Sequence, residues 1–199
     1  MASALAAIDA ANALDPNVID VGDGPEPKEL VHARMMTRWV TTLDPGAGEL
    51  ALVAARAHHF RRWTSPRAEY PEGRAGYLRW RTAARRRHAS EVGDLLAGHG
   101  YGPAEIDRIG AIIRKEGLAT DPVVQTHEDA LCLVFLQTQL TPVAGRLGHD
   151  PTVEVLAKSI RKMSPAGRAA AAGLELDPTA AAVLGEAAAR VSADEAPGS

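Results

Sequence analysis

The sequence is poor in cysteine, in aromatic residues and in long apolar runs. Cys132 is the only cysteine among 199 residues, so an internal disulfide is excluded. Its setting in the string LCLVF predicts a small buried side chain rather than a catalytic thiol. No run reaches the ~18 apolar residues that a membrane span needs, and the apolar N-terminus has no basic leader. These absences predict a cytoplasmic protein with no membrane partner.

The common nucleotide and hydrolase motifs are also missing. The sequence has no Walker-type phosphate loop, no dinucleotide fingerprint, no HExxH string and no paired-cysteine zinc motif. No serine stands in an elbow-like setting, so a Ser-His-Asp triad has no support. Any active site must therefore be assembled from histidine, carboxylate and arginine side chains.

Helical periodicity dominates, and no stretch shows convincing strand alternation. Apolar residues make up 46% of the chain but aromatic residues only 4%, and alanine, which favours close-packed helices, supplies much of the difference. We expect an all-α, single-domain helical bundle of about seven to nine helices over residues 1–190, with a frayed tail at 191–199. The expected helices cover about 2–13, 27–43, 48–63, 72–100, 103–117, 122–140 and 150–163, with one or two short ones after them.

Four polar positions fall inside the second, third, fourth and sixth expected helices: His32, the His58–His59 doublet, His88 and Asp129. Those on the second, fourth and sixth helices share three- and four-residue spacings with apolar neighbours, so we expect them to point inward. A buried aspartate needs a cation, a donor cluster or a proton. Imidazole and carboxylate groups from successive helices can close around one metal ion. We therefore predict one divalent ion (manganese, iron, cobalt or zinc) held by His32, His59, His88 and Asp129.

The doublet leaves a choice open. Consecutive helical residues are about 100° apart, so both rings cannot point at one spot. His59 shares a stripe with Leu52, Arg56 and Trp63 and is favoured as the central residue. Either His58 or Glu128 could manage the proton, or each could instead orient a metal-bound histidine.

Arginine is concentrated in one segment. Ten arginines lie between Arg56 and Arg87 against only two glutamates, which gives this segment +8 in a chain of net charge −3. Guanidinium suits bidentate recognition of phosphate or carboxylate. We predict that Arg62, Arg67, Arg74 and Arg81 bind an anionic substrate, and the alternative is a solvated basic face with surface salt bridges.

Several strings resemble a bacterial and fungal family catalogued as domain of unknown function family 4202. They are AARAHHFRRW, SPRAEYP, RAGYLRWR, DPVVQTHEDALCLVFL and the KM before SPAGR. The resemblance covers nearly the whole chain and implies an all-helical, HD-like domain without an established reaction. The family pattern usually has Gln-His at the doublet, which supports His59 over His58. Its recurrent strings add Arg61, Tyr70, Tyr77, Trp80 and Lys115 to the predicted substrate-binding set.

The histidine spacing has the layout of HD-type metal phosphohydrolases, which use a His, a His-Asp doublet, a further His and a late Asp. Here the doublet ends in His59 instead of Asp. The first hypothesis is a metal-dependent hydrolase or lyase of an anionic, phosphorylated small molecule. The alternative is a non-enzymatic module that binds a nucleotide or another anionic ligand or partner through residues 56–87. The near-neutral net charge argues against a nucleic-acid partner. The arginine, tryptophan and tyrosine residues of the segment leave single-stranded or transfer-RNA binding as a third hypothesis, ranked last because no RNA-binding module is recognisable. A homo-oligomer is compatible with each hypothesis.

Overall fold

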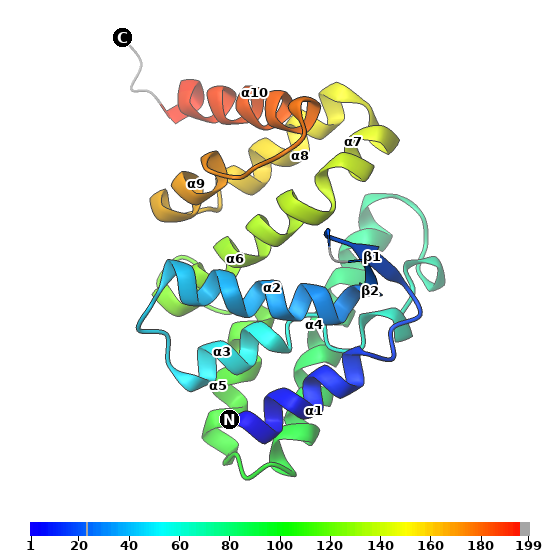
Figure 1. Ribbon diagram of the computed structural model, residues 1–199, viewed down its shortest axis with the longest axis vertical. Coiled ribbons are helices and arrows are strands. Elements are labelled where there is room, and N and C mark those ends of the chain that lie inside the picture. Colours follow the sequence, from blue (N-terminus) through cyan, green and yellow to red (C-terminus); the bar gives the residue numbers. More distant parts are fainter. Residues whose placement is uncertain (23, 196–199) are drawn as a thin grey trace. The chain divides into compact units, whose positions relative to one another are not determined.

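The computed structural model describes residues 1–22 and 24–195 (Figure 1). This part of the chain is mostly helical, which confirms the all-α prediction, although its ten α-helices exceed the predicted seven to nine. The helices are α1 (Ala2–Asn12), α2 (Lys28–Leu43), α3 (Glu49–Arg56), α4 (Gly73–Ala97), α5 (Pro103–Arg114), α6 (Pro122–Thr138), α7 (Leu140–Leu147), α8 (His149–Ile160), α9 (Pro165–Ala172) and α10 (Pro178–Glu195). Two short 3₁₀ turns, η1 (Arg62–Thr64) and η2 (Arg67–Glu69), and two strands, β1 (Val18–Asp20) and β2 (Pro25–Pro27), complete the elements. Among the described residues, no helix is both long and apolar enough to span a membrane.

The chain forms two compact units, Met1–His127 and Glu128–Ser199, and α6 begins in the first and ends in the second. The predicted single domain over residues 1–190 stays a prediction.

The core of the first unit is built by α1, α3, α4 and α5. Ile8, Val53, Leu96 and Ile113 have no exposed surface and pack in one cluster. The same cluster includes the apolar residues that flank the doublet and that follow His88 in α4: Ala57, Phe60 and Ala89. The doublet and His88 are therefore fixed to the core through their immediate sequence neighbours.

The third helix is shorter than predicted, and this changes the geometry of the doublet. It was expected to reach Trp63, but α3 ends at Arg56. The chain then continues in tight turns, in which the amides of residues 58, 60 and 62 each bond to a carbonyl three residues back. Arg61 has a left-handed backbone (φ 49°), and its amide donates to the side chain of Asn12. A left-handed residue cannot continue an α-helix, so Arg61 prevents the helix from resuming. Because α3 ends before the doublet, His58 and His59 are not bound to the 100° helical separation.

A short hairpin holds the start of α2. Strands β1 and β2 pair antiparallel, with Val18 opposite Pro27. Asp15 is buried, and its carboxylate accepts hydrogen bonds from the amides of Asn17 (2.9 Å) and Glu29 (3.1 Å). A carboxylate at the first helical amides satisfies donors that have no partner within the helix. Asp15 thus fixes the backbone at Glu29.

The second unit contains one helix that was not predicted. Helix α7 is separate from α6 because Pro142 has no amide hydrogen and cannot lie in the interior of a continuous helix. Helix α10 packs against α7 and α8 and continues to Glu195. It therefore occupies 191–195 of the predicted frayed tail, while 196–199 lie outside the described residues.

Gly76 should be essential where α4 begins. A Cβ on Gly76 would lie 1.8 Å from the carbonyl oxygen of Pro71. Gly76→Ala should therefore destabilise the protein by about 1–3 kcal/mol in chemical denaturation. The matched control is Gly145→Ala in α7, where a Cβ would meet nothing within 4 Å. It should be neutral or stabilising by up to about 1 kcal/mol, and equal stability of the two variants would contradict the close contact.

Candidate metal centre

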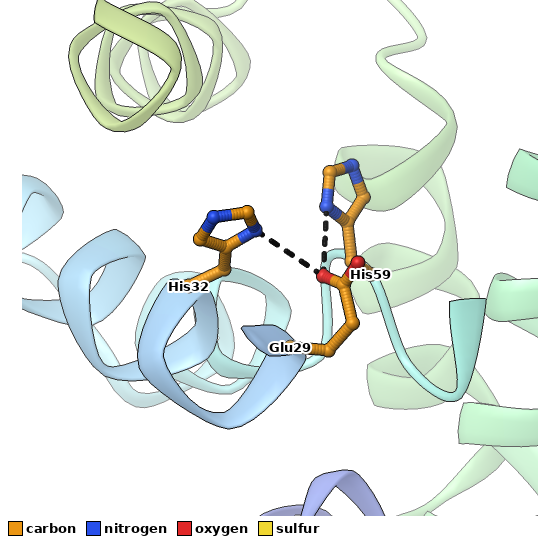
Figure 2. Close-up of side chains that lie close together, drawn as sticks. All are labelled: Glu29, His32 and His59. Carbon is orange, nitrogen blue, oxygen red and sulfur yellow. Dashed lines mark hydrogen bonds and ion pairs between the residues drawn. The ribbon is translucent and has the colours of Figure 1, made fainter. Parts of the chain in front are cut away.

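A carboxylate and two imidazoles meet at the start of α2 (Figure 2). Glu29 and His32 lie three residues apart on α2, so they share one face of the helix. Glu29 Oε2 lies 3.4 Å from His32 Nδ1 and 3.2 Å from His59 Nδ1. One ligand atom from each residue lies within 4.8 Å of the other two. The side chains of Glu29, His32 and His59 are only 6%, 2% and 17% exposed, so the cluster is largely shielded from solvent.

The contacts of His59 define its tautomer. Arg62 Nη1 lies 2.9 Å from His59 Nε2. A guanidinium only donates, so Nε2 accepts, and the ring proton of neutral His59 is on Nδ1, from which it is donated to Glu29. Burial, and then the Arg62 charge, hold the pKa of His59 well below its ordinary value. Burial also lowers the pKa of Arg62, while Glu29 opposes that shift.

His88 presents a free lone pair inside the unit. Its Nδ1 donates to the backbone carbonyl of His58 (3.1 Å), because a carbonyl only accepts. Nε2 is then an acceptor, and it is buried without a hydrogen-bond partner among the described residues. Burial, with the charges of Arg62 and Arg87, lowers the pKa of His88 to about 3. A ring fixed by a carbonyl at one nitrogen and open at the other has the orientation of many metal-bound histidines, and it lies 6.1 Å from the His59 ring.

His58, a predicted proton carrier, belongs to a buried pair. Its Nδ1 lies 2.7 Å from Nε2 of His127, and its ring lies 4.5 Å from that of His59. Burial lowers the pKa of His58 well below its ordinary value and, with the Lys115 charge, lowers the pKa of His127 to about 3. His127 was not among the predicted site residues, yet it is 1% exposed and adjoins the cluster through His58.

Part of the arginine segment forms a ladder of cations and rings that starts at His59. Arg62 lies over the Trp80 ring at 4.6 Å from its centroid, and Arg81 lies over the Tyr77 ring at 5.6 Å. The two aromatic rings are 5.9 Å apart. Tyr77 is 43% exposed, so this ladder runs from the histidine cluster to the surface of α4. It contains four residues of the predicted substrate-binding set.

The remaining members of that set differ in their contacts. Arg67 donates to the backbone carbonyls of Tyr70 and Pro71, and so ties the loop before α4 together. Arg61 forms an ion pair with Glu91 at 3.7 Å, while Arg74 is exposed. Lys115 ends α5 in a left-handed conformation (φ 64°), and its charge adds to the lowered pKa values of His58 and His59. Its ammonium therefore acts electrostatically on the histidine cluster.

Glu128 and Asp129 are buried and belong to the second unit. Asp129 accepts hydrogen bonds from the amide (3.0 Å) and the hydroxyl (2.5 Å) of Ser164, which caps α9. A Cβ on Gly167 would lie 2.6 Å from the Asp129 carboxyl carbon, so this carboxylate sits closely against the N-terminus of α9. The predicted roles of Glu128 and Asp129 at a common site with the histidines stay predictions.

Glu29 is the carboxylate that the sequence analysis did not select. The signal was present, because Glu-x-x-His spacing on a helix places both groups on one face, as in helical carboxylate metal sites. It was overlooked because Glu29 stands at the expected first turn of its helix, where an acidic residue is common. Its backbone amide is held by Asp15, fourteen positions earlier, and its carboxylate meets His59, and only the folded chain brings these residues together.

Acid should destabilise the protein through the buried histidines. The pKa of His88 and of His127 is about 3 in the folded chain, whereas an unfolded histidine takes up its proton near pH 6.5. The unfolded state therefore binds more protons between these values, and stability falls as the pH decreases from about 6.5 towards 3. Between pH 7 and pH 5 each such histidine should lower the free energy of unfolding, measured by urea denaturation, by about 2 kcal/mol.

His127→Gln should remove about that part of the pH dependence, because Gln keeps a hydrogen-bond donor near His58 but does not titrate. His99→Gln, at an exposed histidine, should retain the wild-type dependence. Equal wild-type stability at pH 7 and pH 5 would show that the histidines are not held neutral.

Substitutions at Arg67 and Arg74 should distinguish a structural arginine from an exposed surface arginine. Arg67→Glu removes charge-assisted hydrogen bonds to backbone carbonyls and should destabilise the protein by about 1.5–3 kcal/mol. Arg74→Glu, at an exposed position, should stay within about 0.5 kcal/mol of wild type. Denaturation curves of the two variants decide this, and an unchanged midpoint for Arg67→Glu would remove its structural role.

One family model matches residues 2–184 of the chain, and its description is "Domain of unknown function (DUF4202)". It is the family that the sequence strings resemble. The comparisons with curated proteins and with solved structures found no match. Because the family model covers most of the 199 residues, the chain belongs to the family described as Domain of unknown function (DUF4202).

Proposed function

We propose that this protein is a metal-dependent hydrolase or lyase of an anionic, phosphorylated small molecule, with an HD-like arrangement of ligands. The observation that carries the proposal is the convergence of Glu29, His32 and His59 on one another within 4.8 Å. The buried lone pair on His88 Nε2, one ring away from His59, supports it.

The donor set has the chemistry of a transition-metal site. Two imidazoles and one carboxylate suit manganese, iron, cobalt or zinc, whereas calcium and magnesium prefer oxygen ligands throughout. Glu29 and His32 come from one rigid helix, and His59 is fixed through its neighbours on the core. The residues present therefore fit a divalent ion, with Glu29, His32 and His59 as its ligands and His88 as a further candidate.

Glu29 could replace the carboxylate that is missing from the HD doublet of this chain. The usual doublet supplies an aspartate, and this chain has His59 at that position. The Glu29 carboxylate contacts both His32 and His59, so it could supply the oxygen ligand that the doublet lacks. An HD-like layout with the carboxylate moved to the preceding helix is part of the proposal.

The cluster and the two stacked arginines then have distinct chemical roles. A divalent ion at the cluster would lower the pKa of a bound water and polarise a phosphoryl oxygen. Arg62 and Arg81, oriented on Trp80 and Tyr77, would neutralise the charge of the substrate and its build-up in the transition state. The carbonyl of His58 fixes the ring of His88 and leaves its buried Nε2 lone pair available to the ion. Glu29 and His32 are little exposed, so the electrostatic interactions at the cluster are weakly screened by water and therefore stronger.

One observation favours a non-enzymatic module that binds an anion. Both ring nitrogens of His59 have hydrogen-bond partners, Arg62 and Glu29, as expected for a polar network inside a core. In that case Arg62 and Arg81 would bind the anion and the histidines would support them. Metal content separates the two functions.

Elemental analysis of protein purified without a histidine tag should find about one equivalent of a transition metal. Glu29→Gln keeps the size of the side chain but removes its charge, and should weaken metal affinity by at least about tenfold. The matched control is Glu26→Gln, at a half-exposed glutamate paired with Arg34. A metal-free protein whose melting temperature does not rise with added manganese, iron, cobalt or zinc would support the binding module instead.

A further inference from the structure

Arg62 occupies the only acceptor of neutral His59. The guanidinium donates to Nε2 at 2.9 Å, and the proton on Nδ1 is directed at Glu29. Neutral imidazole has one lone pair in the ring plane, and Arg62 uses it. His59 therefore has no lone pair left for a metal ion while this contact is present.

We propose that Arg62 and a divalent metal ion bind His59 in turn, so that metal loading releases the Arg62 guanidinium to bind the anionic group of the substrate. This inference rests on the proposed metal site. It adds a coupling between metal and substrate that runs through one arginine.

The exclusion holds for either ring nitrogen. An ion bound at Nε2 would lie about 2.0–2.1 Å from it, in the space where Arg62 donates at 2.9 Å. An ion bound at Nδ1 transfers the ring proton to Nε2, because neutral imidazole carries one proton. Nε2–H would then face an N–H of Arg62, and two donors cannot share a hydrogen bond. Arg62 must leave His59 in both cases.

Charge acts in the same direction. The positive charge of Arg62 is offset by Glu29, whose carboxylate also contacts His32 and His59. A divalent ion at these ligands would neutralise Glu29 and repel the nearby guanidinium. Metal and Arg62 thus compete for one carboxylate as well as for one imidazole.

After its release from His59, the Arg62 guanidinium can remain stacked on Trp80. The guanidinium carbon of Arg62 lies over the indole at 4.6 Å, and the indole N–H is fixed by a bond to the Ser65 carbonyl (2.9 Å). Stacking does not use the in-plane N–H groups, which become available for bidentate binding of a phosphate. Affinity for an anion should therefore be higher in the metal-loaded protein.

Calorimetry with chelator-treated, full-length protein tests the competition. Arg62→Met keeps an unbranched side chain on Trp80 but cannot donate, and should bind zinc or manganese about ten- to a hundredfold more tightly than wild type. The matched control is Arg81→Met, which also removes an arginine stacked on an aromatic ring but one that contacts Tyr77 instead of His59. Its metal affinity should match wild type.

A second measurement needs no change at Arg62. Metal added to wild type should alter tryptophan fluorescence, because the guanidinium stacked on Trp80 changes its orientation when its hydrogen bond to His59 breaks. Trp80→Phe should lose this response while Trp39 and Trp63 remain. Inorganic phosphate should bind wild type more tightly after metal loading, and Arg62→Met should lose this gain.

The outcomes separate the two proposals. Metal binding to wild type that is unchanged or weaker in Arg62→Met overturns the competition and leaves the metal site intact. Metal binding without a Trp80 response or a gain in phosphate affinity also overturns it. Absence of metal binding to wild type and to Arg62→Met overturns the proposed function, and this inference with it.

Discussion

The site depends on one buried carboxylate. Glu29 lies in a region with little solvent, and an ionised carboxylate there requires nearby donors or cations. His32, His59 and the charge of Arg62 meet this requirement, and the stacking of Arg62 on Trp80 extends the network to α4. The doublet, the turns after α3 and α4 each contribute one side chain to this network: His59, Arg62 and Trp80.

Lowered pKa values hold His58, His59, His88 and His127 neutral, which is the form that binds metals. Burial is the main cause, and the cations of Arg62 and Lys115 add to it. Two non-glycine residues with left-handed backbones, Arg61 and Lys115, lie at this cluster or act on it. Such conformations cost about 1–3 kcal/mol each and persist where surrounding contacts impose them. Strain and depressed pKa values at one cluster are common at functional sites.

The +8 segment is not a uniform cationic wall. Arg67 holds carbonyls of its own loop, and Arg87 donates to the carbonyl of Arg61. Arg62 and Arg81 instead lie on aromatic rings, with Arg62 reaching the histidine cluster. The segment therefore holds arginines with structural partners beside two arginines on aromatic rings, and only the latter two are proposed to bind the anion.

The sequence by itself determined the helical class, most helix boundaries and the inward direction of His32 and His88, because periodicity and proline or glycine breaks are local properties. It could not determine where α3 ends, since the turns at His58–His59 depend on the left-handed Arg61, whose amide bonds to Asn12 on α1. It also could not select Glu29, whose contacts with Asp15 at the backbone and with His59 at the carboxylate form only in the folded chain. Which carboxylate meets the histidines was decided by tertiary structure alone, because that contact joins residues thirty positions apart through a turn that no local pattern encodes.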